Sequence, residues 1–182
     1  ASQPLIARCR VKQSTKKPLT IKIRKINDNR TLLNIIKLAE KYCSAIGVHP
    51  RTQPQGYSGI PDLKFARQVK RLTKLPIIYS GNINNGEQVE KMLTEFDFIM
   101  IGRACIGNPN IFAELINTKI KKKITFQDWL KLAKKYKLSD TQIKFQALNF
   151  TRDFPGAAQT RNQIANTRDI KEILRVMNKV KA

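Results

Sequence analysis

Basic side chains lie at the ends of short apolar segments in this chain of 182 residues. The segment LTIKIR (19–24) carries Lys22 and Arg24, and His49 follows the segment CSAIGV (43–48). A charged side chain inside a parallel sheet needs a partner, because both faces of such a sheet are normally covered. We therefore expect Lys22 and Arg24 to face a bound ligand near the carboxyl end of their strand.

Turns that contain glycine follow the two later apolar segments, LPIIYS and DFIMIG. Ser80, Gly81 and Asn82 follow the first of these, and Gly102 and Arg103 follow the second. Glycine lets backbone N–H groups approach an anion closely, and the start of a following helix adds a favourable dipole. The two turns therefore predict an anion site of the phosphate type.

The elements that must position these residues alternate along the first two thirds of the chain. The apolar runs are too short for helices and predict strands over 19–23, 43–48, 75–80 and 97–102. Helical periodicity predicts helices over 29–42, 62–73 and 86–95. Strand–helix alternation of this length is typical of parallel strands joined by right-handed crossovers.

The pattern changes to helices alone after Asn117. Two capping signals begin helices there, Thr125 with Asp128 and Ser139 with Gln142, and a last helix is expected over 168–180. The sequence therefore predicts an α/β domain over residues 1–117 and a small all-α domain over residues 118–182. The apolar stripes of the expected helices predict a core that includes Leu32, Leu33, Ile36, Ala39, Ala66, Val69, Val89, Met92, Leu93, Phe126, Leu130, Ala133, Tyr136, Ile173 and Met177.

The balance of charge indicates a polyanionic partner. The chain has 35 basic and 13 acidic residues, and a formal net charge of +22. The bland explanation is a proteome rich in lysine and isoleucine. The three cysteines are widely spaced and form no CxxC pair, which argues against a disulfide framework and against a zinc site. With no long apolar run and no signal peptide, the sequence fits a reducing cytoplasm and no membrane.

Four motifs in order give the chain a specific resemblance. IKIR, GVHPRTQPQGYSG, LPIIYSGNI and IMIGRACIGNPNIF resemble the second half of the catalytic barrel of tRNA-dihydrouridine synthases. FPGAAQTR resembles part of that family's C-terminal helical domain, so the likeness spans roughly residues 17–177. It implies the second half of a (β/α)8 TIM barrel, followed by a helical tRNA-binding domain.

The resemblance also implies an enzyme that uses FMN to reduce the 5,6 double bond of uridines in tRNA, with NAD(P)H as reductant. Lys22 matches the family's lysine against the flavin ring, and His49 matches a histidine that also approaches the flavin. Ser80, Gly81 and Asn82 match a segment usually written Asn-Gly-Asp, so here the glycine turn is kept while the flanking side chains differ. Gly102 and Arg103 match the phosphate-binding pair.

Contacts with the substrate are expected from a second set of residues. For Arg51 and Tyr57, in the loop over the site, flavin phosphate, uridine and RNA backbone are open alternatives. The lysine run 119–123 is expected to add diffuse attraction, with a solvated linker as the alternative. The residues expected to contact substrate or tRNA are Arg24, Arg51, Tyr57, Lys144, Arg152 and Arg161.

The family's proton-donating cysteine has no counterpart in the motifs. It lies in an Asn-x-Gly-Cys-Pro-like segment ahead of the KIR strand, and no such segment occurs in this sequence. Neither Cys9 nor Cys105 fits that role. Half a barrel has two open strand edges. We therefore expect the chain to work with an N-terminal half, either as part of a longer chain or as a separate partner.

Two other functions fit parts of the sequence. A non-catalytic RNA-binding protein descended from such an enzyme suits the charge and the missing cysteine, but has no use for Lys22 inside a barrel. Another FMN barrel that acts on a small molecule has no use for a basic helical region.

Overall fold

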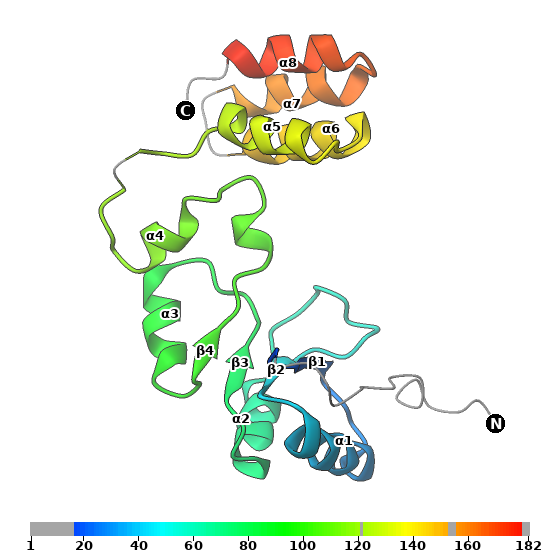
Figure 1. Cartoon of the computed structure of the whole chain (residues 1–182), viewed down its shortest axis with the longest axis vertical. Helices are drawn as coiled ribbons and strands as arrows, with labels where there is room; N and C mark the ends of the chain where they lie inside the picture. The colour runs from blue at the N-terminus through cyan, green and yellow to red at the C-terminus, as the bar shows by residue number, and fades with distance from the viewer. Residues whose placement is uncertain (1–16, 121, 153–155, 180–182) are drawn as a thin grey trace, which may run out of the picture. The chain divides into compact units, whose positions relative to one another are not determined.

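The computed structural model describes residues 17–120, 122–152 and 156–179. It divides into two compact units. The first unit holds the chain up to Tyr79 together with Phe96–Phe98, and the second holds Ser80–Glu95 and the chain from Ile99 onward. Each unit is considered separately below (Figure 1). The predicted domain boundary at residue 117 stays a prediction.

The sheet has four strands in the order of the sequence, β1-β2-β3-β4. β1 pairs with β2 and β2 pairs with β3 in parallel, which places Ile21, Ile46 and Ile77 in one row across the sheet. The α/β class predicted from the sequence is therefore confirmed, and the parallel sheet is consistent with a partial TIM barrel. The strands are β1 (Thr20–Arg24), β2 (Ala45–His49), β3 (Ile77–Tyr79) and β4 (Phe98–Ile99).

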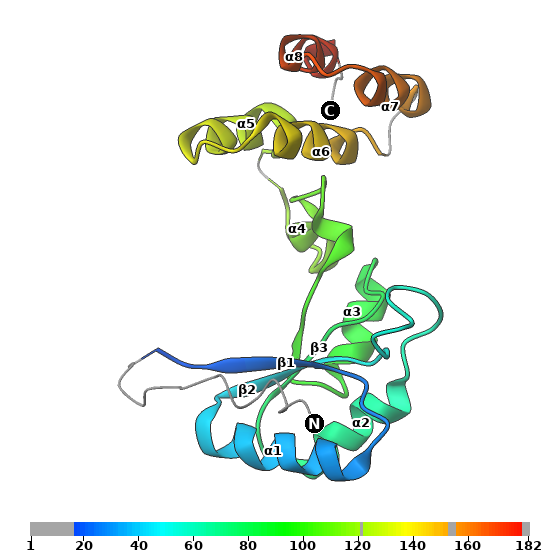
Figure 2. The same ribbon diagram turned by 90° about the vertical axis from the view of Figure 1, so that its right-hand side faces the viewer.

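Two helices, α1 (Asn29–Tyr42) and α2 (Leu63–Leu72), lie on the same side of the sheet, as Figures 1 and 2 show. Each begins at an aspartate whose carboxylate accepts from backbone N–H groups of the first turn, Asp28 for α1 and Asp62 for α2. The core beneath them contains Leu32, Ile36, Ala39, Ile46, Val48, Phe65, Ala66, Val69 and Ile77.

The first unit corrects one expected core residue. Leu33 is 42% exposed, although it was expected to pack in the core. Adjacent residues are rotated by about 100° around a helix axis, so the side of α1 that buries Leu32 and Ile36 turns Leu33 toward solvent.

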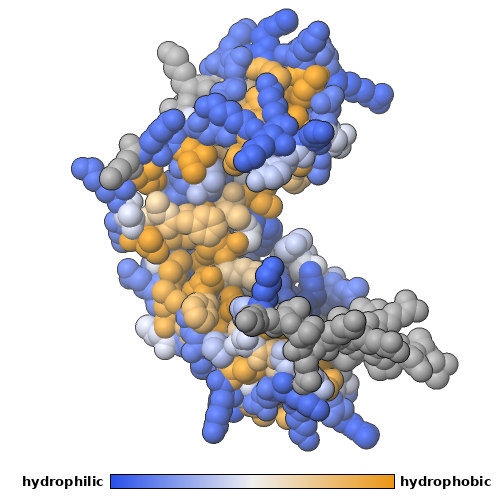
Figure 3. All heavy atoms as spheres, viewed as in Figure 1, coloured by the Kyte–Doolittle hydropathy of each residue, from blue (hydrophilic) through white to orange (hydrophobic). Residues whose placement is uncertain are grey.

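The second unit begins with the short elements that follow β3 and β4. They are α3 (Gly86–Leu93), the 3-10 helix η2 (Arg103–Cys105) and α4 (Ile111–Leu115). Val89 and Met92 of α3 are buried as expected, whereas Leu93 is 49% exposed. Leu93, Phe112 and Ile116 belong to the exposed apolar residues of this unit, whose apolar surface appears in orange in Figure 3.

Four helices follow and share one core. They are α5 (Phe126–Lys135), α6 (Asp140–Phe150), α7 (Ala157–Asn166) and α8 (Ile170–Lys179). Both predicted capping boxes are present, Thr125 with Asp128 and Ser139 with Gln142. The buried cluster that the helices form contains Phe126, Leu130, Ala133, Ile143, Ala147, Ile164, Ile173 and Met177.

Aromatic side chains complete this core. Trp129 stacks on Phe126 at 5.7 Å between ring centroids, and it also lies beside Phe150. It therefore anchors α5 against α6. Tyr136, which the stripe also placed in the core, is 67% exposed because it stands at the C-terminal cap of α5, beyond the last packed turn.

Candidate functional site

Lys22 projects from β1 at a position where the neighbouring strand has no side chain. Its register partner on β2 is Gly47, and a Cβ built there would lie 3.3 Å from the lysine Cγ. The Lys22 side chain is exposed, not buried as the sequence suggested, while Ile21 and Ile23 of the same strand are partly buried. Partial desolvation and then the charge of Arg24 lower the pKa of the Lys22 ammonium. The neighbouring positive charges of Lys22 and Arg24 favour the binding of an anionic or electron-rich group.

Arg24, at the end of β1, is used to hold the loop that follows β2. Its Nη1 donates to the carbonyl oxygens of Thr52 and Gly56, each at 3.2 Å. The backbone N–H of Lys25 also donates to the Arg51 carbonyl at 3.0 Å. Arg24, which was expected to contact substrate, therefore holds the loop over residues 50–59 in place.

Arg51 shapes the same loop from within. Its side chain is 1% exposed, and its Nε donates to the carbonyl oxygens of Ser58 and Gly59 at 3.0 and 3.1 Å. A buried guanidinium bound to backbone carbonyls costs much to disturb. The arginine that was expected to face flavin phosphate, uridine or RNA thus has a structural task in this chain.

His49 ends β2 and lies beneath the loop. Its ring is 6% exposed and meets Tyr57 in an edge-on arrangement, with 6.1 Å between ring centroids. Tyr57 is 60% exposed. A buried imidazole thus supports an exposed phenol at the loop surface, and the two predicted site residues are in contact.

In the second unit the structure joins two residues of the predicted phosphate site. Arg103 Nη2 donates to Asn82 Oδ1 at 2.9 Å. Asn82 therefore orients the guanidinium, although the family usually has an aspartate at this position. Asn82 has φ of 48°, a backbone conformation that asparagine accepts more readily than most residues. Ser80 is buried, and Gly81 links it to Asn82.

The turn at Gly102 differs from the expectation in one respect. A Cβ at Gly102 would meet nothing within 4 Å, so open space lies over its backbone, as an approaching anion requires. The helix expected to add a dipole is a single 3-10 turn, Arg103–Cys105. Its contribution is small, because a macrodipole needs several aligned turns.

The three residues predicted to contact tRNA in the helical region differ in their surroundings. Lys144 Nζ donates to the carbonyls of Ala165 and Thr167 at 2.8 and 2.6 Å, which ties α6 to the end of α7. Arg152 follows α6 and donates to the side-chain oxygen of Asn149. Arg161 is exposed on α7.

Two residues that matter locally were missed by the sequence analysis. Asn149 is 7% exposed on α6 and holds Arg152. Gly107 has φ of 80°, and a Cβ there would lie 2.3 Å from the Asn149 backbone. The Asn-Pro pair in IGNPNI is a turn signal directly after Gly107, whereas a lone asparagine in a helix carries no such signal.

Other kinds of site find no support in the described part of the chain. No group of three or more His, Cys, Asp or Glu residues is placed to hold a metal ion there. Cys43 and Cys105 are free thiols, and burial raises the pKa of Cys43. Cys9 lies outside the described residues. Among the described helices, none has the length and apolarity to cross a membrane.

A sheet with its strands in sequential order, and helices between them, is consistent with part of a (β/α) barrel. The family model described as dihydrouridine synthase (Dus) matches residues 5–180. The chain therefore belongs to the dihydrouridine synthase family.

Individual relatives agree with the family model. A probable tRNA-dihydrouridine synthase of Aquifex aeolicus (strain VF5) is 27% identical over 176 residues, covering 90% of this chain and 56% of the relative. The tRNA-dihydrouridine synthase B of Pasteurella multocida (strain Pm70) is 37% identical over 108 residues, 57% of this chain and 32% of the relative. A probable tRNA-dihydrouridine synthase of Mycobacterium leprae (strain TN) is 35% identical over 119 residues, 62% of this chain and 31% of the relative. The chain thus spans between about a third and just over half of these relatives.

Proposed function

We propose that this chain supplies the second half of the barrel and the tRNA-binding helices of a tRNA-dihydrouridine synthase, which reduces uridine to 5,6-dihydrouridine in tRNA. The observation that carries the proposal is the family match over residues 5–180. FMN, when bound by the barrel residues named below, would supply the hydride, and NAD(P)H would serve as its reductant. A cytoplasmic location is part of the proposal.

Lys22 binds and tunes the flavin in this proposal. Lys22 is the middle residue of β1 with Arg24 two residues further on, and Gly47 leaves room for the lysine stem beside β2. Positive charge near the ring favours the electron-rich reduced state over the oxidised one. His49, buried beneath Tyr57, supports the same region.

Arg103 binds the flavin phosphate in this proposal. The amide oxygen of Asn82 fixes the direction of the guanidinium, and a fixed guanidinium loses less conformational freedom when it binds a phosphate. The space over Gly102 admits the anion to the backbone. Ser80 and Gly81 form the turn that presents Asn82.

The proton that completes the reduction comes from outside this chain in our proposal. We assign it to a cysteine on an N-terminal half-barrel, in the same longer chain or in a partner chain. β1 and β4 lie at the two edges of the described sheet, and Phe98 of β4 is 56% exposed. Strand edges and an exposed aromatic ring of this kind suit closure by further strands.

The tRNA lies against the basic helical region in this proposal. Residues 119–182 hold 16 basic and 5 acidic residues, and Figure 3 shows hydrophilic side chains projecting from much of the surface of these helices. Arg152 and Arg161 are exposed and available to phosphates, whereas Lys144 contributes chiefly by tying α6 to α7. Arg161→Gln should weaken tRNA binding. Lys144→Met should mainly lower the free energy of unfolding, because it removes the bonds that tie α6 to α7.

The test is an absorbance spectrum combined with size-exclusion chromatography of the protein purified from its native source. We expect a yellow species larger than this chain that releases FMN on denaturation. In that assembled enzyme Lys22→Ala should lose flavin or slow its reduction, and Lys37→Ala, on the exposed side of α1, should do neither.

A colourless protein that binds tRNA would overturn the flavin proposal. It would establish instead the second candidate, a non-catalytic RNA-binding protein, which the high positive charge favours. A flavoprotein that ignores tRNA and reduces a small molecule would overturn the substrate assignment alone.

A further inference from the structure

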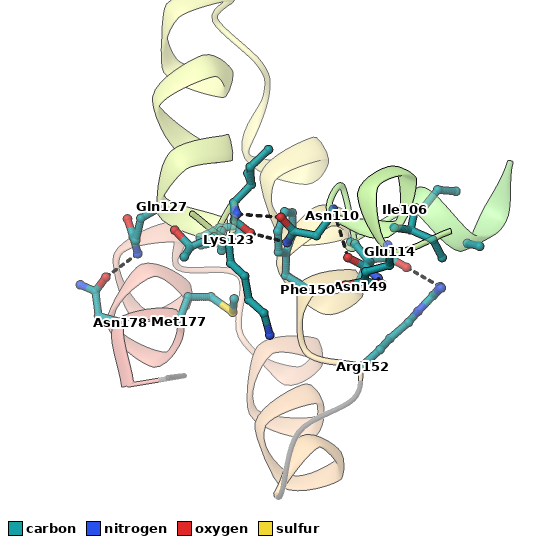
Figure 4. Close-up of a pocket in the computed structure, with 17 residues that line it drawn as sticks. Ile106, Asn110, Glu114, Lys123, Gln127, Asn149, Phe150, Arg152, Met177 and Asn178 are labelled. Atoms are coloured by element: carbon teal, nitrogen blue, oxygen red, sulfur yellow. Dashed lines mark hydrogen bonds between the residues drawn. The ribbon is translucent and has the colours of Figure 1, made fainter. Parts of the chain in front are cut away.

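The second unit contains an open pocket whose lining includes Gly107, Asn149 and Arg152. Its volume is about 690 Å³, and its walls come from the turn over 104–111, the start of α5, the end of α6 and the end of α8 (Figure 4). Pockets that hold small organic ligands have volumes of about 300–1,000 Å³. The space therefore suits a ligand the size of one nucleotide.

The lining has three chemical parts. Ile106, Phe150 and Met177 give it an apolar wall. Amide side chains surround that wall, and Gln127 donates to Asn178 across it at 2.5 Å. Two cationic side chains complete the lining, Lys123 and Arg152, with one carboxylate, that of Glu114.

Arg152 is held in place at this pocket. Its guanidinium donates to Oδ1 of Asn149, as Figure 4 shows. Asn149 is 7% exposed, and its own Nδ2 donates to the Phe145 carbonyl at 2.7 Å. A buried asparagine fixed on α6 therefore sets the direction of the arginine before any ligand binds.

The opposite wall is equally fixed. Asn110 bridges to the backbone of Ile124 with two hydrogen bonds, at 3.0 and 2.8 Å. These bonds hold the segment that carries Lys123 beside the turn. Gly107 lies against the backbone of Asn149, so the turn and α6 approach as closely as main chains can. The pocket is therefore formed in advance of binding.

We propose that this pocket binds one unstacked nucleotide of the RNA substrate, distinct from the uridine that is reduced. Arg152 and Lys123 bind the phosphate, and the base lies on the apolar wall with its edge toward the amides. Glu114 repels a bare phosphate, but it accepts a hydrogen bond from an exocyclic amino group. The base is therefore one with such a group, adenine, cytosine or guanine, and AMP is the probe chosen for the test.

The inference rests on the proposed function in one respect, because tRNA is taken as the source of the nucleotide. The site is tested by measuring the affinity of the assembled protein for an unmodified tRNA transcript at several salt concentrations. The variants are Arg152→Gln and Lys123→Gln. Lys122→Gln is the matched control, since it removes the same charge from the adjacent exposed residue, which does not line the pocket.

Each pocket variant should weaken tRNA binding about tenfold, the worth of one charge-assisted hydrogen bond. Each should also reduce the log–log salt slope by about 0.7–0.9. Lys122→Gln should change affinity less than about twofold, as expected for an exposed charge. Equal losses for Lys122→Gln and Lys123→Gln would mean diffuse attraction and would overturn the proposal.

Competition tests the nucleotide itself. AMP should displace the tRNA from this site at lower concentration than UMP, and both at lower concentration than inorganic phosphate. Glu114→Gln should remove the preference for AMP over UMP. Equal competition by AMP and inorganic phosphate would overturn the nucleotide assignment.

The flavin content of every variant separates this inference from the proposed function. Pocket variants that lose tRNA affinity and keep their flavin support both proposals. Variants that keep flavin and lose no affinity overturn the pocket alone. A protein that never holds flavin, but loses tRNA affinity with Arg152→Gln, overturns the reductase and leaves the pocket in place.

Discussion

Lys22 on β1 lies directly opposite Gly47 on β2, and the lysine Cγ stands 3.3 Å from the place that a Cβ on residue 47 would take. The glycine thus decides where the lysine stem can lie. Ile78 of β3 is the next residue in the same row beyond Gly47, so Lys22 shares this face of the sheet with Ile78.

Gly47→Ala tests that relationship. The added methyl should push the Lys22 stem aside, because an exposed side chain moves more readily than a strand. We expect stability within about 1 kcal/mol of the parent and, in the assembled enzyme, a loss of flavin in the same direction as Lys22→Ala. Urea unfolding and flavin per chain measure the two effects. Full flavin content with an unchanged reduction rate would contradict the role given to the Lys22 stem.

Arg51→Lys tests the loop over 50–59. A lysine has no planar fork and cannot donate to both the Ser58 and Gly59 carbonyls from the same position. We expect a loss of about 2–4 kcal/mol in the free energy of unfolding and faster proteolysis inside the loop. Limited proteolysis with mass spectrometry locates the cut. A loop as resistant as the parent's would show that the buried guanidinium does not hold it.

Asp97 should make stability depend on pH. The Ile77 N–H, which donates to Oδ2 at 2.7 Å, and then Lys70 lower the pKa of this carboxyl. The unfolded chain therefore binds the proton more readily than the folded chain, so the stabilisation is present above the ordinary carboxyl pKa and is lost as pH falls through the folded one.

Asp97→Asn should cost about 1 kcal/mol near neutral pH, a modest value because the group is partly exposed. It should also flatten the loss of stability below about pH 4. Lys70→Met, which keeps the Ile77 bond, should flatten that loss only in part. Urea unfolding at a series of pH values measures both. If the free energy of unfolding fell with pH in the same way for Asp97→Asn and the parent, Asp97 would not be the cause of the acid dependence.

Gly107→Ala and Gly156→Ala form a matched pair. Both glycines have positive φ, 80° and 81°, so an alanine is strained at either. At Gly107 the new Cβ would also stand 2.3 Å from the Asn149 backbone, whereas nothing lies within 4 Å at Gly156. We expect about 1 kcal/mol lost at Gly156 and more than about 3 kcal/mol at Gly107. Trp129 fluorescence follows the unfolding. Equal losses of unfolding free energy for the two variants would contradict the close contact between Gly107 and the Asn149 backbone.

The sequence predicted the elements well where the signal is local. The helix expected over 29–42 has those bounds, and both capping boxes form as their spacing requires. Strand positions are right to within two residues at their starts, since short apolar runs can be recognised without tertiary context. The prediction that Leu33 lies in the core was wrong, because the width of a helix's buried apolar stripe depends on what the helix packs against.

The roles of charged residues were harder to predict. Arg51 looked like a ligand contact in sequence, and the structure turns it inward to the loop carbonyls. The RNA contact predicted for Lys144 stays a prediction, and in the structure its Nζ donates to the Thr167 carbonyl at the end of α7. A sequence shows that a cation is present, but its partners come from backbone groups many residues away, whose placement depends on the whole fold.

In the proposed tRNA-binding enzyme, the guanidinium groups of Arg24 and Arg51 have a consequence for the rate of RNA recognition. Because they bind four carbonyls of one loop, the surface around Tyr57 has its shape before an RNA arrives. Little ordering is then left for the encounter, so diffusion and long-range charge set how fast the complex forms. Variants of this loop should alter how long the RNA stays bound far more than how quickly it binds.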